Sequence, residues 1–279
     1  MINETLQQNV ISGKVANIEH RDGTMSNGAE YVGGTVEIEV GEDNIIPVSF
    51  FATKMKKDGS PNPIYPSLQT VINDYKTIAS HGRDEADSVD VGAVRLQENT
   101  FFVRDGHMIR GWQFSSPFFN RRAGAESKGE FTVVGEVVDT EDEIINDVPT
   151  GNMIVRMMLI TYGNTANIID FAVEGEKAVS YVKANFTPGV QVKISGDILI
   201  VEKIEEKTSE AAFGDPIVEQ IRTVDRKLLI KSATAPTDSP ITEEQRETIL
   251  AERESKIAET KERFLQKQKG AKKSANFSL

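Results

Sequence analysis

Aromatic and cationic side chains are concentrated in one segment near the middle of the 279-residue chain. Residues 110–122 include the only tryptophan, Trp112, together with three phenylalanines and three arginines. Such rings can stack on nucleobases, at about 1–3 kcal/mol per base, and guanidinium groups can hold phosphates. In a strand, Arg110, Trp112 and Phe114 would share one face. That face is therefore either a binding surface or part of the hydrophobic core.

Two further phenylalanines lie outside strand alternation. Phe118 and Phe119 follow a proline and precede Arg121 and Arg122. This arrangement favours rings that stack on bases beside arginines that hold phosphates. The alternative is a hydrophobic plug at the end of a barrel.

Two pairs of adjacent phenylalanines raise a question of side-chain direction. They are Phe50-Phe51 and Phe101-Phe102. Consecutive residues of a strand point to opposite faces, so one ring of each pair must leave the interior. An outward ring needs a partner, either a base or another domain.

Other candidates are cationic or aromatic residues in loops and near strand ends, for which a solvated surface is the alternative. We expect phosphate contacts from the cations and stacking from the rings. The predicted nucleic-acid-binding residues are Trp112, Phe114, Phe118, Phe119, Arg110, Arg121, Arg122, Lys54, Lys56, Lys57, Tyr65, Phe102, Arg156, Tyr162, Arg222, Lys227 and Lys231.

The chain carries little catalytic equipment. Cysteine is absent, and the three histidines, His20, His81 and His107, lie far apart. Thiolate chemistry is therefore excluded, and no adjacent pair of histidines could bind zinc. Glycine-rich phosphate loops, a nucleophile elbow and an H-E-x-x-H motif are also missing. The acidic stretch 139–147 lacks the spacing of a calcium loop and is interpreted as a solvated loop. We expect no enzyme activity, no cofactor and no metal site.

The formal net charge of −11 at first argues against a nucleic-acid partner. Salt limits the reach of each charge to about 8 Å, so the local distribution matters more. Residues 264–279 hold four lysines and no acid, and residues 102–122 hold four arginines against one acid. No apolar run approaches the ~18 residues of a membrane span, and the N-terminus lacks signal-peptide features. We expect a cytoplasmic protein with no membrane partner.

Hydrophobic periodicity predicts a mainly β chain with two similar halves. The first half has strands and one helix over 67–79, and the second repeats this order with a helix at 176–186. Three strands, a helix and two strands are the order of an oligonucleotide/oligosaccharide-binding (OB) barrel. We therefore expect two tandem five-stranded OB barrels, over 1–122 and 131–236, joined by a small, polar linker at 123–130.

The remaining residues, 237–279, are predicted to form a helical arm with a basic tail. A capping box precedes residues 243–268, which contain no proline or glycine. Leu250, Ile257 and Phe264 recur every seven residues and form a stripe one residue wide. This stripe is too narrow for a core-facing helix. It favours an arm that docks lightly on a neighbour, or a weak coiled coil.

One stretch of the second half combines strand and helix signals in a specific order. It runs from VVGEV through MIVRMMLIT to IIDFAVEGEKAVSYVKANFTPGVQVKISGDI, where Pro188-Gly189 ends a helix. Over about 131–200 this stretch resembles the bacterial-type single-stranded DNA-binding protein (SSB) family, which implies an OB barrel and a nucleic-acid ligand. Two fused barrels and a helical, basic tail depart from that family's usual single barrel and flexible acidic tail. They look more like a divergent, phage-encoded form or like tandem-barrel replication proteins.

We therefore expect a protein that coats and protects single-stranded DNA in replication, recombination or repair, largely independently of sequence. RNA and oligosaccharides remain open as ligands, and homo-oligomers remain open as an assembly state. Replication or recombination proteins would bind the C-terminal arm. If the chain is phage-encoded, it would act in the host cytoplasm. The alternative is an assembly protein whose OB barrels dock protein partners.

Overall fold

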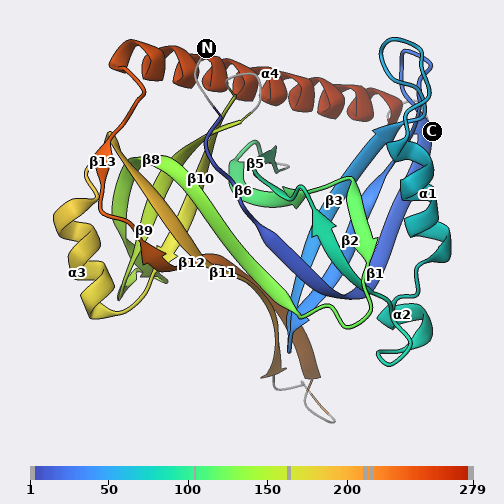
Figure 1. Ribbon diagram of the computed structural model, residues 1–279, viewed down its shortest axis with the longest axis horizontal. Helices are drawn as coiled ribbons and strands as arrows, with labels where there is room; N and C mark the ends of the chain where they lie inside the picture. The colour runs from blue at the N-terminus through green and yellow to red at the C-terminus, as the bar shows by residue number, and fades with distance from the viewer. Residues whose placement is uncertain (1–3, 104, 162–164, 210–212, 214–216, 276–279) are drawn as a thin grey trace.

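The computed structural model describes residues 4–103, 105–161, 165–209, 213 and 217–275. The chain is mainly β, with a long C-terminal helix (Figure 1). Its first part contains β1 (Val10–Thr24), β2 (Glu30–Gly41), β3 (Asn44–Thr53), α1 (Ile64–Asp74), α2 (Ile78–His81), β4 (Ser88–Gly92), β5 (Arg95–Phe102), β6 (Met108–Ser115) and β7 (Phe118–Arg121). Its second part contains β8 (Lys128–Ile145), β9 (Val148–Thr161), β10 (Thr165–Val173), α3 (Glu176–Asn185), β11 (Val190–Ser209), β12 (Ile217–Ala233), β13 (Thr237–Asp238) and α4 (Glu243–Ala275). No helix in the described ranges is both long and apolar enough to cross a membrane.

The first part closes into a barrel. Strand β1 pairs antiparallel with β2 and β4, and β2 pairs antiparallel with β3. Strand β3 then pairs in parallel with β6, and β7, which follows β6 directly, pairs with β4 to complete the ring. Alternate residues such as Val36, Ile38 and Val48 fill the interior. Strands β5 and β6 form a hairpin that extends from the ring between β4 and β7.

The second part repeats the same pairing scheme. Strands β8, β9 and β10 form an antiparallel meander, β10 pairs in parallel with β12, and β11 joins β12 to β8. Helix α3 lies between the third and fourth strands, as α1 and α2 do in the first part. This connectivity is that of the OB barrel, so the predicted fold class is confirmed.

The helix predicted over 67–79 is divided into α1 and α2. Leu68 is buried as the helical pattern requires. The backbone becomes extended at Tyr75, with φ −83° and ψ 131°, and the Tyr75 hydroxyl donates to the carbonyl of Phe119 at 2.6 Å. The side chain of Thr77 then caps α2. The tyrosine hydrogen bond to β7 and the new cap therefore override the local periodicity.

The acidic segment predicted as a loop is largely strand. The solvated-loop interpretation of 139–147 is wrong, because β8 continues to Ile145 and pairs with β9. Asn146 and Asp147 form the turn of this hairpin, and both have positive φ. Strands β11 and β12 form a second long two-stranded ribbon, which reaches the pair Ser209 and Ile217. Charged side chains on two-stranded ribbons explain why the hydrophobic pattern missed them.

Backbone pairing joins the two barrels along a seam. Strand β1 pairs with β8 over three residue pairs, and Asn44 of β3 is paired with Val201 of β11. The Asn44 side chain donates to the carbonyl of Ile198 at 2.9 Å and accepts from the amide of Ile200 at 3.0 Å. The two barrels thus share one continuous hydrogen-bonded sheet.

Helix α4 lies across both barrels (Figure 1). At its N-terminal end, Ile249 and the preceding Ile241 are buried against Met158, Ile160 and Ala166 on the outer face of β9 and β10. Helix α4 therefore docks as an arm on the barrels of its own chain, and the coiled-coil alternative stays a prediction. Ile249 widens the narrow apolar stripe of the helix. Two arginines on the same side add ion pairs with the barrels.

Two arginines of α4 bind glutamates on the barrels. Arg246 pairs with Glu136 of β8 at 2.5 Å, and Arg253 pairs with Glu98 of β5. The Glu136 side chain is 2% exposed. Arg246 and Arg253 are seven residues apart, so they lie on the same face of the helix. One arginine therefore binds the second barrel and the other binds the hairpin of the first.

The ion pair between Glu98 and Arg253 should make the stability of the fold depend on pH. Burial alone would raise the pKa of Glu98, but hydrogen bonds from Arg253 and the Ile168 amide outweigh it and hold the pKa below its ordinary value of 4.5. A carboxyl with a lowered pKa stabilises the fold above its ordinary pKa and loses that contribution as pH falls through the folded-state pKa. We expect the stability difference between wild type and Glu98→Gln, measured by urea unfolding, to be constant from pH 7 to 5 and to shrink below about 4.5. A difference that grows on acidification would contradict this assignment.

Candidate nucleic-acid interface

A trough of about 1020 Å³ lies on the outer face of the first barrel. Its floor is formed by β2 and β3, and its walls by β1, the hairpin β5–β6 and the connection into β7. OB barrels take ligands on the face of their second and third strands, between the 1–2 and 4–5 loops. The trough occupies this position, and the hairpin β5–β6 is the connection between the fourth and fifth strands of the barrel.

Two exposed aromatic rings line the trough. Phe51 of β3 is 55% exposed and Phe118 of β7 is 44% exposed. Phe51 stacks on Tyr31 with ring centroids 5.4 Å apart. Their sequence neighbours, Phe50 and Phe119, are buried below and contact each other edge to face at 6.1 Å. Each of these two Phe-Phe pairs therefore presents one ring to the core and one to solvent.

Unpaired arginines lie beside these rings. Arg21 of β1 and Arg95 of β5 both line the trough and are exposed. Within the described part of the chain, neither forms an ion pair with a carboxylate. His20 and Glu19 also line this wall. The trough thus offers free cationic groups in a protein whose net charge is −11.

The floor of the trough is kept flat by two glycines. Gly33 and Gly34 of β2 both line it. A Cβ on Gly34 would lie 2.0 Å from the carbonyl oxygen of Glu19 and 2.9 Å from the Phe50 ring. Only glycine at position 34 therefore lets the paired strands β1 and β2 approach so closely. Gly33 is on the same face of the sheet as Phe51, and its missing side chain leaves the outer surface open there.

The hairpin β5–β6 has two different faces. One carries Arg95 and Gln97 of β5 and Gln113 of β6 into the trough, and ends in the exposed cross-strand pair Phe101 and Ile109. These residues alternate along their strands, so they share one face. The opposite face is turned toward α4 and the second barrel.

Several of the predicted binding residues are on that opposite face, away from the trough. Trp112 is buried, with the guanidinium of Arg226 4.8 Å from its ring centroid. Phe102 is buried beside Phe264 of α4, with centroids 6.1 Å apart. Arg110 lies on the same face and is exposed there. The predictions for Trp112 and Phe102 are therefore corrected because both rings are buried, whereas the role of Arg110 stays a prediction.

Phe114 and Phe119 are also corrected, because both are buried in the core of the first barrel. Tyr65 is half-buried against that core and lies outside the trough lining. Lys56 and Lys57 are exposed on the segment after β3, likewise outside the lining. Of the predicted aromatic residues, Phe118 alone is both exposed and in the trough among those described.

Most of the predicted cations are engaged with carboxylates, which lowers their availability for phosphates. Lys54 is also outside the lining of the trough. The pairs are Lys54–Glu30 at 2.5 Å, Arg121–Asp87 at 3.2 Å, Arg122–Asp90 at 2.6 Å, Lys227–Glu174 at 2.6 Å and Lys231–Asp197 at 3.5 Å. Tyr162 lies outside the described residues, and Arg222 is described only by its place in β12.

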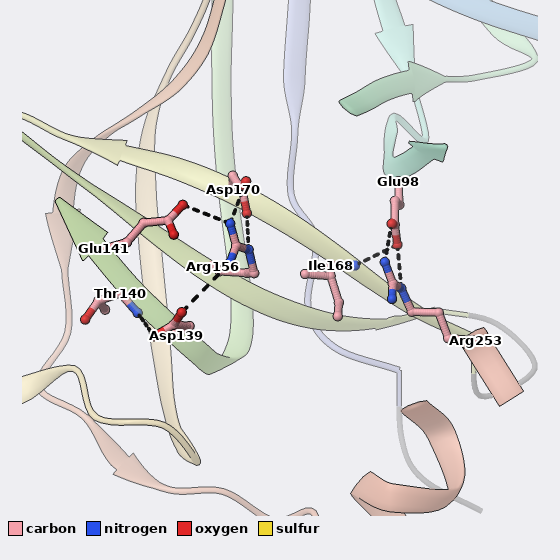
Figure 2. Close-up of polar contacts among 8 residues, drawn as sticks. All are labelled: Glu98, Asp139, Thr140, Glu141, Arg156, Ile168, Asp170 and Arg253. Atoms are coloured by element: carbon pink, nitrogen blue, oxygen red, sulfur yellow. Dashed lines mark hydrogen bonds and ion pairs between the residues drawn. The ribbon is translucent and has the colours of Figure 1, made fainter. Parts of the chain in front are cut away.

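The equivalent face of the second barrel is occupied differently. Its apolar part, on β9 and β10, is covered by α4. Next to it, Arg156 is surrounded by Asp170 at 2.9 Å, Glu141 at 3.0 Å and Asp139 at 3.9 Å (Figure 2). The hydrogen bond to Asp170 outweighs partial burial and raises the pKa of Arg156. Three carboxylates around one cation make a poor phosphate site. Arg156 is also outside the lining of the trough.

The sequence reasoning missed Arg21, Arg95 and Tyr31. Arg95 could have been found, because Arg95 and Gln97 alternate along the strand with Phe101, the exposed ring of the Phe101-Phe102 pair. Arg21 is near the end of the long strand β1, and nothing in the local sequence shows which way its side chain points.

The YorF family model matches residues 7–263, so the chain belongs to the YorF family. No curated protein sequence matches the chain. Among solved structures, a deletion mutant of the single-stranded DNA binding protein from Thermus aquaticus is similar with 11% identity and a TM-score of 0.49, covering 86% of this chain and 98% of that chain. The wild-type protein from Thermus aquaticus gives 10% identity and a TM-score of 0.48, covering 86% and 97%.

Proposed function

We propose that this chain is a binding protein, rather than an enzyme, that holds single-stranded DNA in the trough of its first barrel. Binding is largely independent of base sequence, because stacking and phosphate contacts dominate. The protein would cover transient single strands in the cytoplasm during replication, recombination or repair.

One observation carries the proposal. Phe51 and Phe118 are exposed in the same trough as Arg21 and Arg95, which have no carboxylate partner among the described residues. Large apolar rings normally lie inside a protein or against a partner. Bases that stack on these rings would bring their phosphates within reach of the two arginines, which is the chemistry of single-stranded nucleic-acid grooves.

The second barrel supports placing the strand on the first barrel alone, because the corresponding face of the second barrel is already occupied by its own contacts. Helix α4 covers Met158 and Ile160, and three carboxylates surround Arg156. We therefore propose one bound strand per chain, with a footprint within the ~4–16 nucleotides that a single OB barrel covers.

Fluorescence anisotropy of labelled oligo-dT tests the function directly. We expect saturable binding, with log K falling against log[salt] by about 0.7 per phosphate contacted. Unlabelled poly-U as competitor measures the preference between DNA and RNA. Absence of binding at micromolar protein in low salt would contradict the proposed function.

Arg21 and Arg95 give the salt dependence a specific test. The double variant Arg21→Ala/Arg95→Ala is expected to bind more weakly and to lose about 1.4 from the magnitude of the salt slope, because two phosphate contacts are removed. The control is Arg122→Ala, which removes an exposed arginine that is paired with Asp90. An unchanged slope in the double variant would show that these two arginines do not contact phosphates.

A protein-docking role is the second candidate, and one observation favours it. The tip of the hairpin β8–β9 exposes Ile144, Ile145 and Val148. An apolar tip of this kind is typical of an interaction surface. The variant Ile145→Ser/Val148→Ser separates the two roles, since an assembly protein should lose its complex while a DNA-binding protein should keep its oligo-dT affinity.

A further inference from the structure

The wall of the trough formed by the hairpin β5–β6 has little backbone pairing with its own barrel. Strand β5 is at the edge of the sheet and pairs only with β6 among the described strands. Strand β6 pairs with β3 only at Phe114 and Ser115. The rest of the hairpin, including Gln97 and Gln113 in the trough, extends beyond the barrel. A two-stranded hairpin alone is marginally stable in water, so its position must be fixed by other contacts.

Glu98, on the face opposite the trough, supplies several of these contacts, and Figure 2 shows its carboxylate beside Arg253 and Ile168. Arg226 of β12 adds a hydrogen bond to the carbonyl of Trp112 at 3.2 Å. The Glu98 carboxylate accepts hydrogen bonds from both Nε of Arg253, at 2.8 Å, and Nη2 of Arg253. It also accepts from the amide of Ile168 at 3.1 Å and from the hydroxyl of Thr100 at 3.0 Å. The Glu98 amide donates to Asn167 at 3.0 Å. One residue thus connects the hairpin to α4 and to β10 of the second barrel.

The geometry of this connection is restrictive. The side chains of Glu98 and Arg253 are 9% and 12% exposed, so salt screens their interaction weakly. A guanidinium that binds a carboxylate through two nitrogens fixes direction as well as distance. The ring of Phe102 against Phe264 adds a second contact between the hairpin and α4. These contacts hold the hairpin where its other face completes the trough.

We propose that Arg253 is a positioning residue for nucleic-acid binding: through Glu98, α4 holds the hairpin β5–β6 in the conformation that forms one wall of the trough. This inference rests on the proposed function. Arg253 does not face the trough and contacts no ligand there. It acts by keeping the binding-competent conformation populated, because apparent affinity falls in proportion to the fraction of molecules in that conformation.

The test compares two half-buried arginines of the same helix. Arg253→Ala is expected to weaken oligo-dT binding about tenfold, if the competent fraction falls to about one tenth, with an unchanged salt slope. Arg246→Ala removes the equivalent pair with Glu136, which does not contact the hairpin, and is expected to change affinity less than threefold. Both are measured at a temperature where circular dichroism shows them folded. Glu98→Gln combined with Arg253→Ala should bind no more weakly than Arg253→Ala alone.

Hairpin position provides a readout independent of affinity. The chain contains no cysteine, so spin labels can be attached at Ser26→Cys in the β1–β2 turn and Asp105→Cys in the β5–β6 turn. We expect a narrow distance distribution that broadens in Arg253→Ala and narrows again with oligo-dT. Equal affinity losses for Arg253→Ala and Arg246→Ala, or no broadening, would overturn the positioning role. Failure of the proposed function itself would appear separately, as absence of oligo-dT binding by the wild type.

Discussion

Replacing Phe51 and Phe118 together with alanine is expected to weaken oligo-dT binding by on the order of 10²-fold or more, because each ring that stacks on a base contributes about 1–3 kcal/mol. Both rings are on the surface of the trough, so their removal leaves the core intact. The measurement is anisotropy of labelled oligo-dT, with urea unfolding to show that stability is retained. Each single variant should lose a substantial part of the double variant's effect.

A matched control for these rings is Tyr181→Ala. Tyr181 is an exposed aromatic residue of α3, outside the trough, and its loss should leave binding unchanged. If the Phe51/Phe118 double variant binds oligo-dT as well as wild type, the trough is not the nucleic-acid site. Equal losses in the control and the double variant would indicate a non-specific effect of surface hydrophobicity.

Arg246→Ala is expected to destabilise the protein by about 3–5 kcal/mol, because it leaves the buried carboxylate of Glu136 without its cation. In the wild type, hydrogen bonding to Glu136 outweighs desolvation and raises the pKa of Arg246. In the variant, Ser239 would be the remaining side-chain donor to Glu136 among the described residues. Urea unfolding followed by circular dichroism measures the loss.

The comparison that isolates burial is Arg263→Ala. Arg263 pairs with Glu259 on the exposed side of the same helix, at 3.3 Å, and its removal should cost less than about 0.5 kcal/mol. The double variant Arg246→Leu/Glu136→Leu should be less destabilised than Arg246→Ala, since it leaves no unpaired charge. If Arg246→Ala lowers the free energy of unfolding only slightly, the fold does not need Arg246 to compensate the buried charge of Glu136.

The barrels could be predicted from the sequence because their determinants are local. Val36, Ile38 and Val40 alternate as a half-buried strand requires, and all three are buried. The Pro188-Gly189 pair ends α3 where predicted, followed by inward Val192 and Ile194. Repetition of this order in the two halves was sufficient to indicate the OB topology.

The binding surface could not be predicted as fully, because it depends on which face of a strand is inside. Alternation places Trp112 and Phe114 on one face, but only the parallel pairing of β6 with β3 turns that face inward. Availability of a cation likewise depends on partners distant in sequence. The sequence marks Arg122 as a candidate phosphate contact, but in the fold it pairs with Asp90 of β4. Arg95 has no carboxylate partner within the described residues.

The ion pairs that attach α4 to the barrels were missed for the same reason. A stripe of Leu250, Ile257 and Phe264 is narrow when apolar residues alone are counted. Arg246 and Arg253 repeat at the same interval, and their carboxylate partners are 110 and 155 residues away along the chain. Buried glutamates on predicted strands carry no local signal that an arginine will reach them.

The seam between β1 and β8, reinforced by Asn44, has a mechanical consequence. Two barrels that continue one sheet cannot swing about a hinge as domains on a flexible tether do. If several molecules bind one strand in a row, as the proposed function implies, curvature of the row would be taken up between neighbouring molecules rather than within each one. The repeat distance along such a row would then be set by the fixed dimensions of the individual protein.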